Sequence, residues 1–380
     1  MANKLRVLFA GGGTGGHIYP MVAVAQVLKD KAIQAGLEPD FRYFGNPGAY
    51  LGELKLQGLR ISRVASSKMR RYFSLLNFLD FFKFWFSLAQ CLWKMYWFMP
   101  DVIFSKGGPG ALPVVIIGFF YAIPVVVHES DTIPGLTTRL SARLARFIEL
   151  AFASAAGRLP KVRAQINIVG NPIRQFLLEK VPADQAKSSI NFDPAKPLML
   201  VFGGSQGSNR MNDFIIANLE TILLKFQVMH VVGKEKFQDY KNQFDFLTKN
   251  YSPILMQNYR YAEYLSPQEM NVAMDAADLI VARGGSGSIF EIAAKGKPAI
   301  IVPFPESAAD HQKENAYEYA ASGAAEVIEQ ENLLPSIFMS EAEKLVFKSE
   351  VNAKMVAAAN AFARPDSAEK ISVDILALIS

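Results

Sequence analysis

The chain has 380 residues, of which 51% are hydrophobic and 20% are charged. This balance excludes a disordered chain, and the length suits about two domains of the usual ~100–200 residues. Cys91 is the single cysteine, which excludes an intrachain disulfide and favours a reducing, cytoplasmic setting. Residues 1–4 are too short and too polar for a signal peptide, so none is expected.

The net charge is distributed unevenly along the chain. Residues 1–170 carry a net charge of +11 and residues 171–380 one of −6, against +5 for the whole chain. This asymmetry predicts two domains with different partners, and an anionic surface such as a membrane or a nucleic acid would favour the first half. The alternative is that the surface charges are unevenly distributed without any partner that recognises them.

Apolar runs alternate with helical spacing from the first residues onward. Residues 5–10 precede a glycine loop at 11–17 and a helical pattern over 20–29. The same strand, loop and helix recur at 198–202, 203–208 and on to Leu224. Other expected strands are 41–44, 102–104, 125–127, 227–232, 279–282 and 299–302. The alternation predicts an α/β chain with two Rossmann-like, doubly wound parallel sheets.

A break in regular structure predicts the domain boundary. Gly170, Asn171 and Pro172 interrupt the pattern, which gives a first domain over residues 1–169 and a second over 170–365. The tail shows helical patterns at 340–362 and 366–379, separated by Pro365. By analogy with other two-domain α/β proteins, a helix over 366–380 is expected to pack back on the first domain.

The first glycine loop predicts an anion site. Its small residues let main-chain N–H groups approach an anion at a helix start. Gly11, Gly13 and Gly16 match G-x-G-x-x-G, but a dinucleotide dehydrogenase also needs an acid ending the second strand, and residues 41–44 are followed by glycine and asparagine. His17 follows the loop, where the helix start would keep it neutral and suited to act as a general base. A purely structural histidine is the alternative.

Two loops in the second half could hold a diphosphate from two sides. Residues 203–208 and 283–291 each follow an apolar strand and present N–H groups and hydroxyls at a helix start. Glu291 could accept hydrogen bonds from a ribose, or could instead stabilise the helix start by ~0.3–1 kcal/mol. The chain has no Asp-x-Asp pair and its four histidines do not cluster, so no bound metal is expected. Cations such as Arg174 would then balance the phosphate charge.

Residues 72–99 are rich in aromatic side chains and follow Lys68, Arg70 and Arg71. Asp80, Lys83 and Lys94 within the segment fit a helix lying in a membrane interface better than one spanning the bilayer. The residues expected to face the membrane are Phe81, Phe82, Trp85, Trp93 and Trp97. A buried amphipathic helix is the alternative for part of the segment.

Seven segments in a fixed order carry a resemblance to a known family over nearly the whole chain. They are residues 11–17, 104–108, 128–136, 170–174, 203–207, 283–291 and 310–316. In these segments the chain resembles the MurG-type transferases of peptidoglycan synthesis, which have the GT-B fold of two domains facing a cleft. It differs from the commoner family pattern after Gly108, at Ser266 and Pro267, and in the high aromatic content of 72–99.

The resemblance implies an activity and its partners. The family moves N-acetylglucosamine from UDP-N-acetylglucosamine to the 4-hydroxyl of the muramyl sugar in lipid I, making lipid II with inversion. It implies no cofactor and no metal, an anionic membrane surface as a further partner, and no nucleic acid. It also implies a peripheral position on the cytoplasmic face of the cell membrane.

Site residues follow from the same resemblance. The donor contacts it implies are Thr14, Gly15, Gly16, Arg174, Ser205, Gln206, Leu265, Ser286, Gly287, Ser288, Glu291 and Gln312. Of these, Glu291 would hold the ribose, Gln312 the sugar, and Leu265 would lie near the uracil. The glycine loop with His17 would also line the acceptor side, together with His128, Glu129 and Asp131.

His17 is the first candidate for the catalytic base and Asp131 the second. Three other functions remain open at this point. A related transferase could act on another lipid acceptor, a UDP-sugar epimerase would share the two-domain fold, and a non-catalytic membrane scaffold would bind no UDP.

Overall fold

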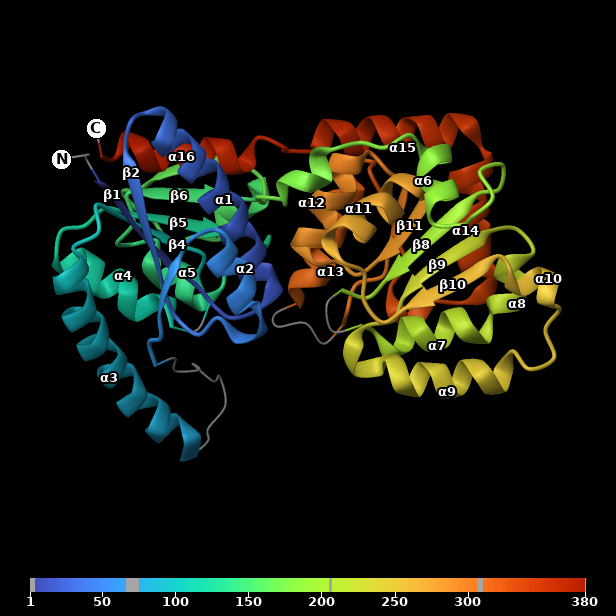
Figure 1. The fold of residues 1–380 in the computed structure, drawn as a ribbon, viewed down its shortest axis with the longest axis horizontal. Helices are drawn as coiled ribbons and strands as arrows, with labels where there is room; N and C mark the ends of the chain where they lie inside the picture. Colours follow the sequence, from blue (N-terminus) through green and yellow to red (C-terminus); the bar gives the residue numbers. More distant parts are fainter. Residues whose placement is uncertain (1–3, 66–74, 109, 205–206, 306–309, 380) are drawn as a thin grey trace. The chain divides into compact units, whose positions relative to one another are not determined.

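The computed structural model describes residues 4–65, 75–108, 110–204, 207–305 and 310–379. The chain divides into two compact units, Met1–Arg174 with Arg364–Ser380 (unit 1) and Gln175–Ala363 (unit 2). Each unit is built on one parallel sheet flanked by helices (Figure 1). The predicted α/β fold with two doubly wound sheets is therefore confirmed.

The sheet of unit 1 has seven parallel strands in the order β3-β2-β1-β4-β5-β6-β7. Its strands are β1 (Lys4–Ala10), β2 (Glu38–Phe44), β3 (Arg60–Ser62), β4 (Val102–Ser105), β5 (Val125–Glu129), β6 (Phe147–Leu150) and β7 (Gln165–Ile168). The order reverses between β1 and β4, which is the switch point where ligands bind in open α/β sheets. The helices are α1 (Gly15–Gln34), α2 (Leu51–Leu56), α3 (Leu75–Phe98), α4 (Ala111–Phe120), α5 (Leu136–Ser141) and α16 (Ser367–Ala377).

The central strand β1 shows how the two faces of this sheet are covered. Val7 and Phe9 belong to one apolar cluster with residues of α1 and α16. Leu8 and Ala10, which point to the opposite face, belong to a second cluster with residues of α3 and α4. Successive side chains of a strand point to opposite faces, so a strand covered on both sides must be apolar throughout. This explains why the apolar run over residues 5–10 predicted a strand from the sequence alone.

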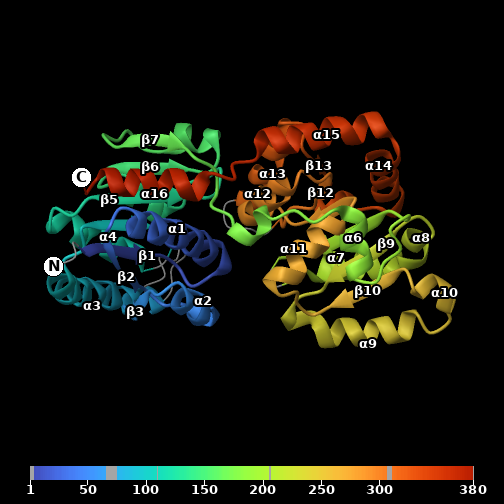
Figure 2. The same ribbon diagram turned by 45° about the horizontal axis from the view of Figure 1, so that its top comes forward.

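The C-terminal helix α16 packs against α1 and lies alongside β7 (Figure 2). Ile371 and Ile375 are fully buried in the same apolar cluster as α1. A polar contact joins the helix to the sheet, because Asn167 Nδ2 donates to Glu149 Oε1 and to Asp374 Oδ2, both at 3.1 Å. Glu149 is 0% exposed, and burial together with the nearby Asp374 raises its pKa to about 8.

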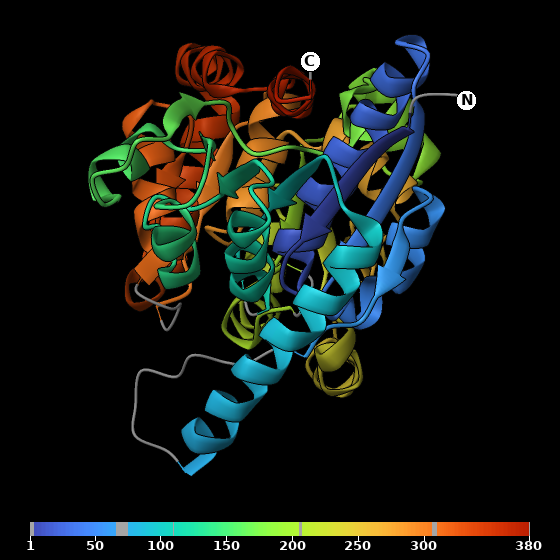
Figure 3. The ribbon, with the colours of Figure 1, turned by 90° about the vertical axis from the view of Figure 1, so that its left-hand side faces the viewer.

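Helix α3 packs on the unit with one stripe only. Ser87, Cys91, Met95 and Phe98 recur at helical spacing and are buried, and α3 contacts α4. Its N-terminal part extends away from the sheet in Figure 3. Its outer side chains are exposed, as described below. None of the described helices combines the length and apolar character needed to cross a bilayer.

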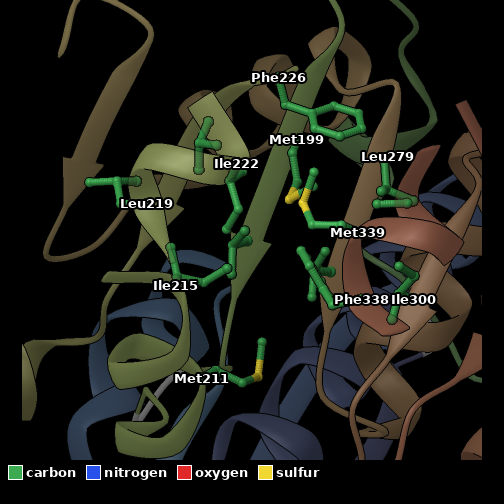
Figure 4. Packing of buried hydrophobic residues seen from close by; sticks show 14 of the residues in the cluster. Met199, Met211, Ile215, Leu219, Ile222, Phe226, Leu279, Ile300, Phe338 and Met339 are labelled. Carbon is green, nitrogen blue, oxygen red and sulfur yellow. The ribbon is translucent and has the colours of Figure 1, made fainter. Parts of the chain in front are cut away.

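Unit 2 repeats the same design with six parallel strands in the order β10-β9-β8-β11-β12-β13. They are β8 (Leu198–Phe202), β9 (Gln227–Val231), β10 (Tyr259–Ala262), β11 (Leu279–Ala282), β12 (Ala299–Ile301) and β13 (Glu326–Val327). Figure 4 shows Met199 of β8 and Ile300 of β12 packed with Phe338 on one face of the sheet. All of the described residues in this core belong to unit 2.

The helices of unit 2 are α6 (Ala183–Ser189), α7 (Asn209–Ala217), α8 (Leu219–Leu223), α9 (Phe237–Leu247), α10 (Pro253–Met256), α11 (Pro267–Ala276), α12 (Ser286–Lys295), α13 (His311–Ala321), α14 (Pro335–Phe347) and α15 (Ser349–Phe362). The single helical pattern predicted over 340–362 is wrong, because Lys348 is extended and separates α14 from α15. Asn352 Nδ2 donates to the Leu345 carbonyl at 2.8 Å, which satisfies a main-chain group at the end of α14.

Candidate active site

The glycine loop of unit 1 joins β1 to α1 at the switch point of the sheet. Thr14 caps α1 and Gly15 and Gly16 form its start. Gly15 is buried, whereas Thr14 and Gly16 are exposed. An exposed helix start offers unpaired N–H groups and partial positive charge to an anion.

The His17 ring lies against the main chain of Gly12 and Gly108. A Cβ atom at Gly12 would lie 2.9 Å from His17 Nδ1, and one at Gly108 would lie 3.0 Å from His17 Nε2. The hydroxyl of Thr14 lies 2.7 Å from Nδ1. Burial and the charge of Lys106 lower the pKa of His17 to about 4, against a raising effect of Asp131. The side chain is half-buried, so a neutral imidazole remains open to a substrate.

Lys106 is a functional candidate to which sequence reasoning gave no role. It follows β4 and is only 2% exposed. Its Nζ donates to Ser130 Oγ at 2.5 Å. Burial lowers the pKa of Lys106 to about 8, while Glu129 and Asp131 oppose that shift. No local pattern marks a lysine as buried, because its partner lies 24 residues further along the chain.

The predicted acceptor-side residues follow β5. Glu129 accepts from the main-chain N–H groups of Asp131 and Gly135, both at 3.1 Å, and so shapes the turn that carries Asp131. Burial raises the pKa of Glu129, and Asp131 adds to that rise. Asp131 is half-buried. His128 is fully buried with Nε2 3.0 Å from the Gly170 carbonyl, and burial lowers its pKa.

Arg174 is the last residue of unit 1, and its guanidinium lies 4.8 Å from the ring centre of Tyr19 in α1. The contacts of the preceding paragraphs bring His17, Lys106, Ser130 and Asp131 together at the carboxyl edge of the unit 1 sheet.

In unit 2, the predicted donor residues follow successive strands at the carboxyl edge of the sheet. Leu265 follows β10 and is 8% exposed. Ser266 and Pro267, where the chain differs from the commoner family pattern, begin α11 with a capping box between Ser266 and Glu269. Ser205 and Gln206 lie outside the described residues.

The third loop, residues 283–291, leads into α12, which starts with Ser286, Gly287 and Ser288 after Gly285 as the capping residue. Gly285 has no side chain to cap these N–H groups, so the helix start is suited to bind a phosphate. Glu291 lies in the same helix and is half-buried. Gln312 lies near the start of α13, and its Oε1 accepts from the Phe304 N–H at 3.1 Å.

The third loop packs directly on α13. A Cβ atom at Gly284 would lie 2.2 Å from the Gln312 carbonyl oxygen, so no larger residue fits there. This close approach places the starts of α12 and α13 side by side.

Arg283 is a second residue to which sequence reasoning gave no role. It is 6% exposed and donates to the carbonyls of Val302 and Pro303, to Ser208 Oγ and to Gln330 Oε1. Burial lowers its pKa to about 10, so it stays charged at neutral pH. Arg283 therefore ties the second glycine loop, residues 203–208, to the ends of β11 and β12.

Among the described residues, no cluster of three His, Cys, Asp or Glu side chains could hold a metal ion.

The outer face of α3 carries the side chains predicted to meet a membrane. Phe81, Phe82, Trp85, Trp93 and Trp97 are 54% to 68% exposed. Tyr121 OH donates to the Leu92 carbonyl and brings the end of α4 beside α3. There Phe119 and Phe120 are 61% and 70% exposed. We call these seven residues the aromatic surface.

Helix starts and glycine loops at the carboxyl edges of two doubly wound sheets define a GT-B type of protein. Solved structures agree on the fold. The crystal structure of MurG from Acinetobacter baumannii superposes with a TM-score of 0.73 at 22% identity, covering 98% of this chain and 99% of that one. A UDP-GlcNAc 2-epimerase from Neisseria meningitidis, bound to UDP-GlcNAc, gives 0.67 at 14% identity, with 98% and 99% coverage.

Sequence comparison identifies the family. Residues 7–148 match the glycosyltransferase family 28 N-terminal domain, and residues 198–371 match its C-terminal domain. Related UDP-N-acetylglucosamine–N-acetylmuramyl-(pentapeptide) pyrophosphoryl-undecaprenol N-acetylglucosamine transferases include one from Treponema denticola, 31% identical over 91% of this chain and 89% of its own. Another, from Clostridium botulinum, is 34% identical over 88% and 87%. The chain belongs to this family of glycosyltransferases.

Proposed function

We propose that the chain transfers N-acetylglucosamine from UDP-N-acetylglucosamine to the 4-hydroxyl of the N-acetylmuramyl sugar in lipid I, the undecaprenyl-pyrophosphoryl-linked pentapeptide, and so makes lipid II. The observation that carries this proposal is the identity of 31% to 34% with transferases of this name over 87–90% of their length. The epimerase structures share the fold at 14% identity, which supports no activity.

Unit 2 would hold the donor. The start of α12, Ser286–Lys295, offers main-chain N–H groups for the diphosphate, and Ser205 and Gln206 are proposed to join them. Glu291 would accept from the ribose, Gln312 would contact the sugar, and Leu265 would lie near the uracil. Arg174, Thr14, Gly15 and Gly16 are proposed as further contacts to the donor.

Unit 1 would hold the acceptor and its base. The acceptor oxygen attacks the anomeric carbon as the bond from that carbon to the UDP oxygen breaks, which inverts the configuration. When Nδ1 of His17 donates to Thr14, Nε2 carries the lone pair that takes the hydroxyl proton. Asp131 is the second candidate for this role, and Glu129 and His128 would support the acceptor side. Negative charge that develops on UDP is stabilised by fixed N–H dipoles, often the larger contribution.

The aromatic surface would bind the membrane that contains the acceptor. Single exposed aromatic residues are common on protein surfaces, but α3 and α4 together carry seven of them. Such a concentration of exposed apolar side chains is typical of an interaction site. Residues 1–170 carry a net charge of +11, which would favour an anionic lipid surface. We propose a peripheral position on the cytoplasmic face of that membrane.

The test is transfer of labelled N-acetylglucosamine from its UDP conjugate to a short-chain lipid I analogue, with and without EDTA. Product in both arms supports a metal-independent transferase. Donor hydrolysis without transfer would keep the class but discard lipid I as the acceptor. Conversion of UDP-N-acetylglucosamine to its 2-epimer, without acceptor, would overturn the proposal in favour of an epimerase.

A further inference from the structure

The second glycine loop, residues 203–208, rests on the main chain that follows β9. A Cβ atom at Gly207 would lie 2.2 Å from the Val232 carbonyl oxygen, and Gly207 has a φ of +75°, so a larger residue does not fit there. Asn212, in the first turn of α7, is 3% exposed, and its Nδ2 donates to the same carbonyl at 3.1 Å. The loop and the helix after it therefore meet at one main-chain carbonyl of unit 2.

The hydrogen bonds around Asn212 can run in one direction only. Because Nδ2 of Asn212 faces a carbonyl, Oδ1 is the atom that lies 3.1 Å from His230 Nε2, so Nε2 carries the hydrogen and donates it. Nδ1 of His230 then accepts from the Tyr259 hydroxyl at 3.0 Å, and that hydroxyl accepts from Tyr240. His230 is fully buried, and burial lowers its pKa to about 3, so the ring stays neutral at neutral pH.

A buried polar side chain occupies the matching position of unit 1. His230 is the second last residue of β9 and pairs with Val201 of β8. Tyr43 is the second last residue of β2 and pairs with Phe9 of β1. The Tyr43 hydroxyl donates to the Gly11 carbonyl in the first glycine loop at 2.9 Å. In each unit, the strand beside the glycine loop thus ends with a buried polar group directed at that loop or its helix.

Packing alone would not require a histidine at position 230. Val228, two residues earlier and on the same face of β9, belongs to the apolar core together with Tyr240 and Tyr259. An apolar side chain could fill the same space, and buried polar groups are costly unless they are hydrogen-bonded. What the imidazole adds is a fixed N–H donor for Asn212.

We propose that His230 is a positioning residue for the donor: through Asn212 it fixes the second glycine loop and the start of α7 in the arrangement that binds the diphosphate. This inference rests on the proposed function. His230 need not touch the donor, because it acts through Asn212.

The experiment separates the two ring nitrogens of His230. A Gln side chain places its amide where Nε2 lies and can still donate to Asn212, whereas an Asn side chain reaches only as far as Nδ1. A loop that holds its binding arrangement only about a tenth of the time binds about tenfold more weakly, so the Kd for UDP, measured by calorimetry, should rise about tenfold in His230→Asn. His230→Gln should stay within about twofold of wild type. KM for UDP-N-acetylglucosamine should follow the Kd, and KM for the lipid I analogue should not change.

Tyr43→Phe is the matched control, because it removes the equivalent buried polar group from unit 1. It should leave the Kd for UDP unchanged. Equal losses in His230→Asn and His230→Gln, or an unchanged Kd in His230→Asn, would show that His230 only fills the core and would overturn the proposal. A wild-type chain that binds UDP but makes no lipid II would end the proposed function, whereas the Kd values would still decide the role of His230.

If His230→Asn does not fold, as judged by circular dichroism, the wild-type chain decides. Coupling between two equilibria is reciprocal, so bound UDP should slow the exchange of the His230 Nε2 hydrogen with solvent by about tenfold, as measured by NMR. An exchange rate that stays the same at saturating UDP would overturn the proposal.

Discussion

The ring of His17 is positioned by main chain on two sides and by one hydroxyl. Because Gly12 and Gly108 have no side chains, the imidazole can lie directly on their backbones. The hydroxyl of Thr14 then orients Nδ1, and burial keeps the ring neutral. These features suit a group that must accept a proton without first losing one.

Replacing His17 with Ala should lower kcat by ~10²–10⁴-fold, the usual contribution of a positioned base. Affinity for UDP, measured by calorimetry, should stay nearly constant, because the proposed diphosphate site is in unit 2. Asp131→Asn is the comparison that ranks the two candidates. An unchanged kcat in His17→Ala would remove His17 as the base and leave Asp131.

Gly108→Ala should lower both stability and turnover. Gly108 has a φ of +81°, which costs an alanine on the order of 1 kcal/mol, and the new Cβ would lie 3.0 Å from His17 Nε2. Gly36→Ala is the matched control, since its φ is +72° and its Cβ would meet nothing within 4 Å. Both variants should lose stability in urea unfolding, Gly108→Ala the more because its Cβ would also lie 3.0 Å from the Gly12 main-chain nitrogen, and kcat should fall only in Gly108→Ala. An equal effect on kcat in both would contradict this account.

At the scale of elements, the strands that sequence predicted are those buried on both faces. β8 and β11 were predicted with their observed limits, because Leu198–Phe202 and Leu279–Ala282 are continuous buried apolar runs. β7 was missed, since it lies at the edge of the sheet and its side chains are largely exposed. β6 was missed because it contains the buried acid Glu149. Pairing across the sheet, which sequence does not show, stabilises these two strands.

The site was predictable to a similar extent. Glycine loops and helix starts are local patterns, so their positions after β1, β8 and β11 followed from sequence. Lys106 and Arg283 acquire their roles from partners far along the chain, Ser130 and Ser208. No spacing rule links such pairs, and only the folded structure reveals them.

Glu149 gives unit 1 a specific dependence on pH. Its pKa is about 8 in the folded chain against 4.5 as the ordinary value, so the folded state keeps a proton that the unfolded state releases. Stability should therefore fall as pH rises from about 4.5 to 8. Glu149→Gln keeps an oxygen for Asn167 and should be more stable than wild type at pH 8 by about 1–2 kcal/mol. Equal urea midpoints for both proteins at pH 8 would contradict this prediction.

Trp93→Ser combined with Trp97→Ser should weaken binding to anionic vesicles by at least about tenfold, because each large aromatic contributes ~1.5–3 kcal/mol when buried. Co-sedimentation at fixed salt measures the effect. Phe246→Ser is the control, since Phe246 is 80% exposed but lies on α9 of unit 2. Equal losses in both variants would mean that general surface hydrophobicity, not the aromatic surface, governs binding.

At the scale of the whole molecule, a described apolar core lies within unit 2 and two others lie within unit 1. Effects on the donor and on the membrane should therefore be independent. Glu291→Gln should weaken UDP-N-acetylglucosamine binding and leave vesicle binding unchanged. The variant with Trp93→Ser and Trp97→Ser should weaken vesicle binding and leave UDP-N-acetylglucosamine binding unchanged. In the combined variant the two losses should add within ~0.3–0.5 kcal/mol, as measured by calorimetry and co-sedimentation. A larger deviation would reveal coupling between the units.

The buried Cys91 makes the chain convenient for spectroscopy. It is the single thiol among 380 residues, it is 0% exposed on the inner stripe of α3, and burial raises its pKa to about 12. The native thiol should therefore resist maleimide dyes at neutral pH. A cysteine introduced at any outward position of α3 could then be labelled alone, without first removing the native one. With the dye placed at successive positions of that helix, quenching of its fluorescence by lipid-attached quenchers would report how deep each turn lies in a bilayer.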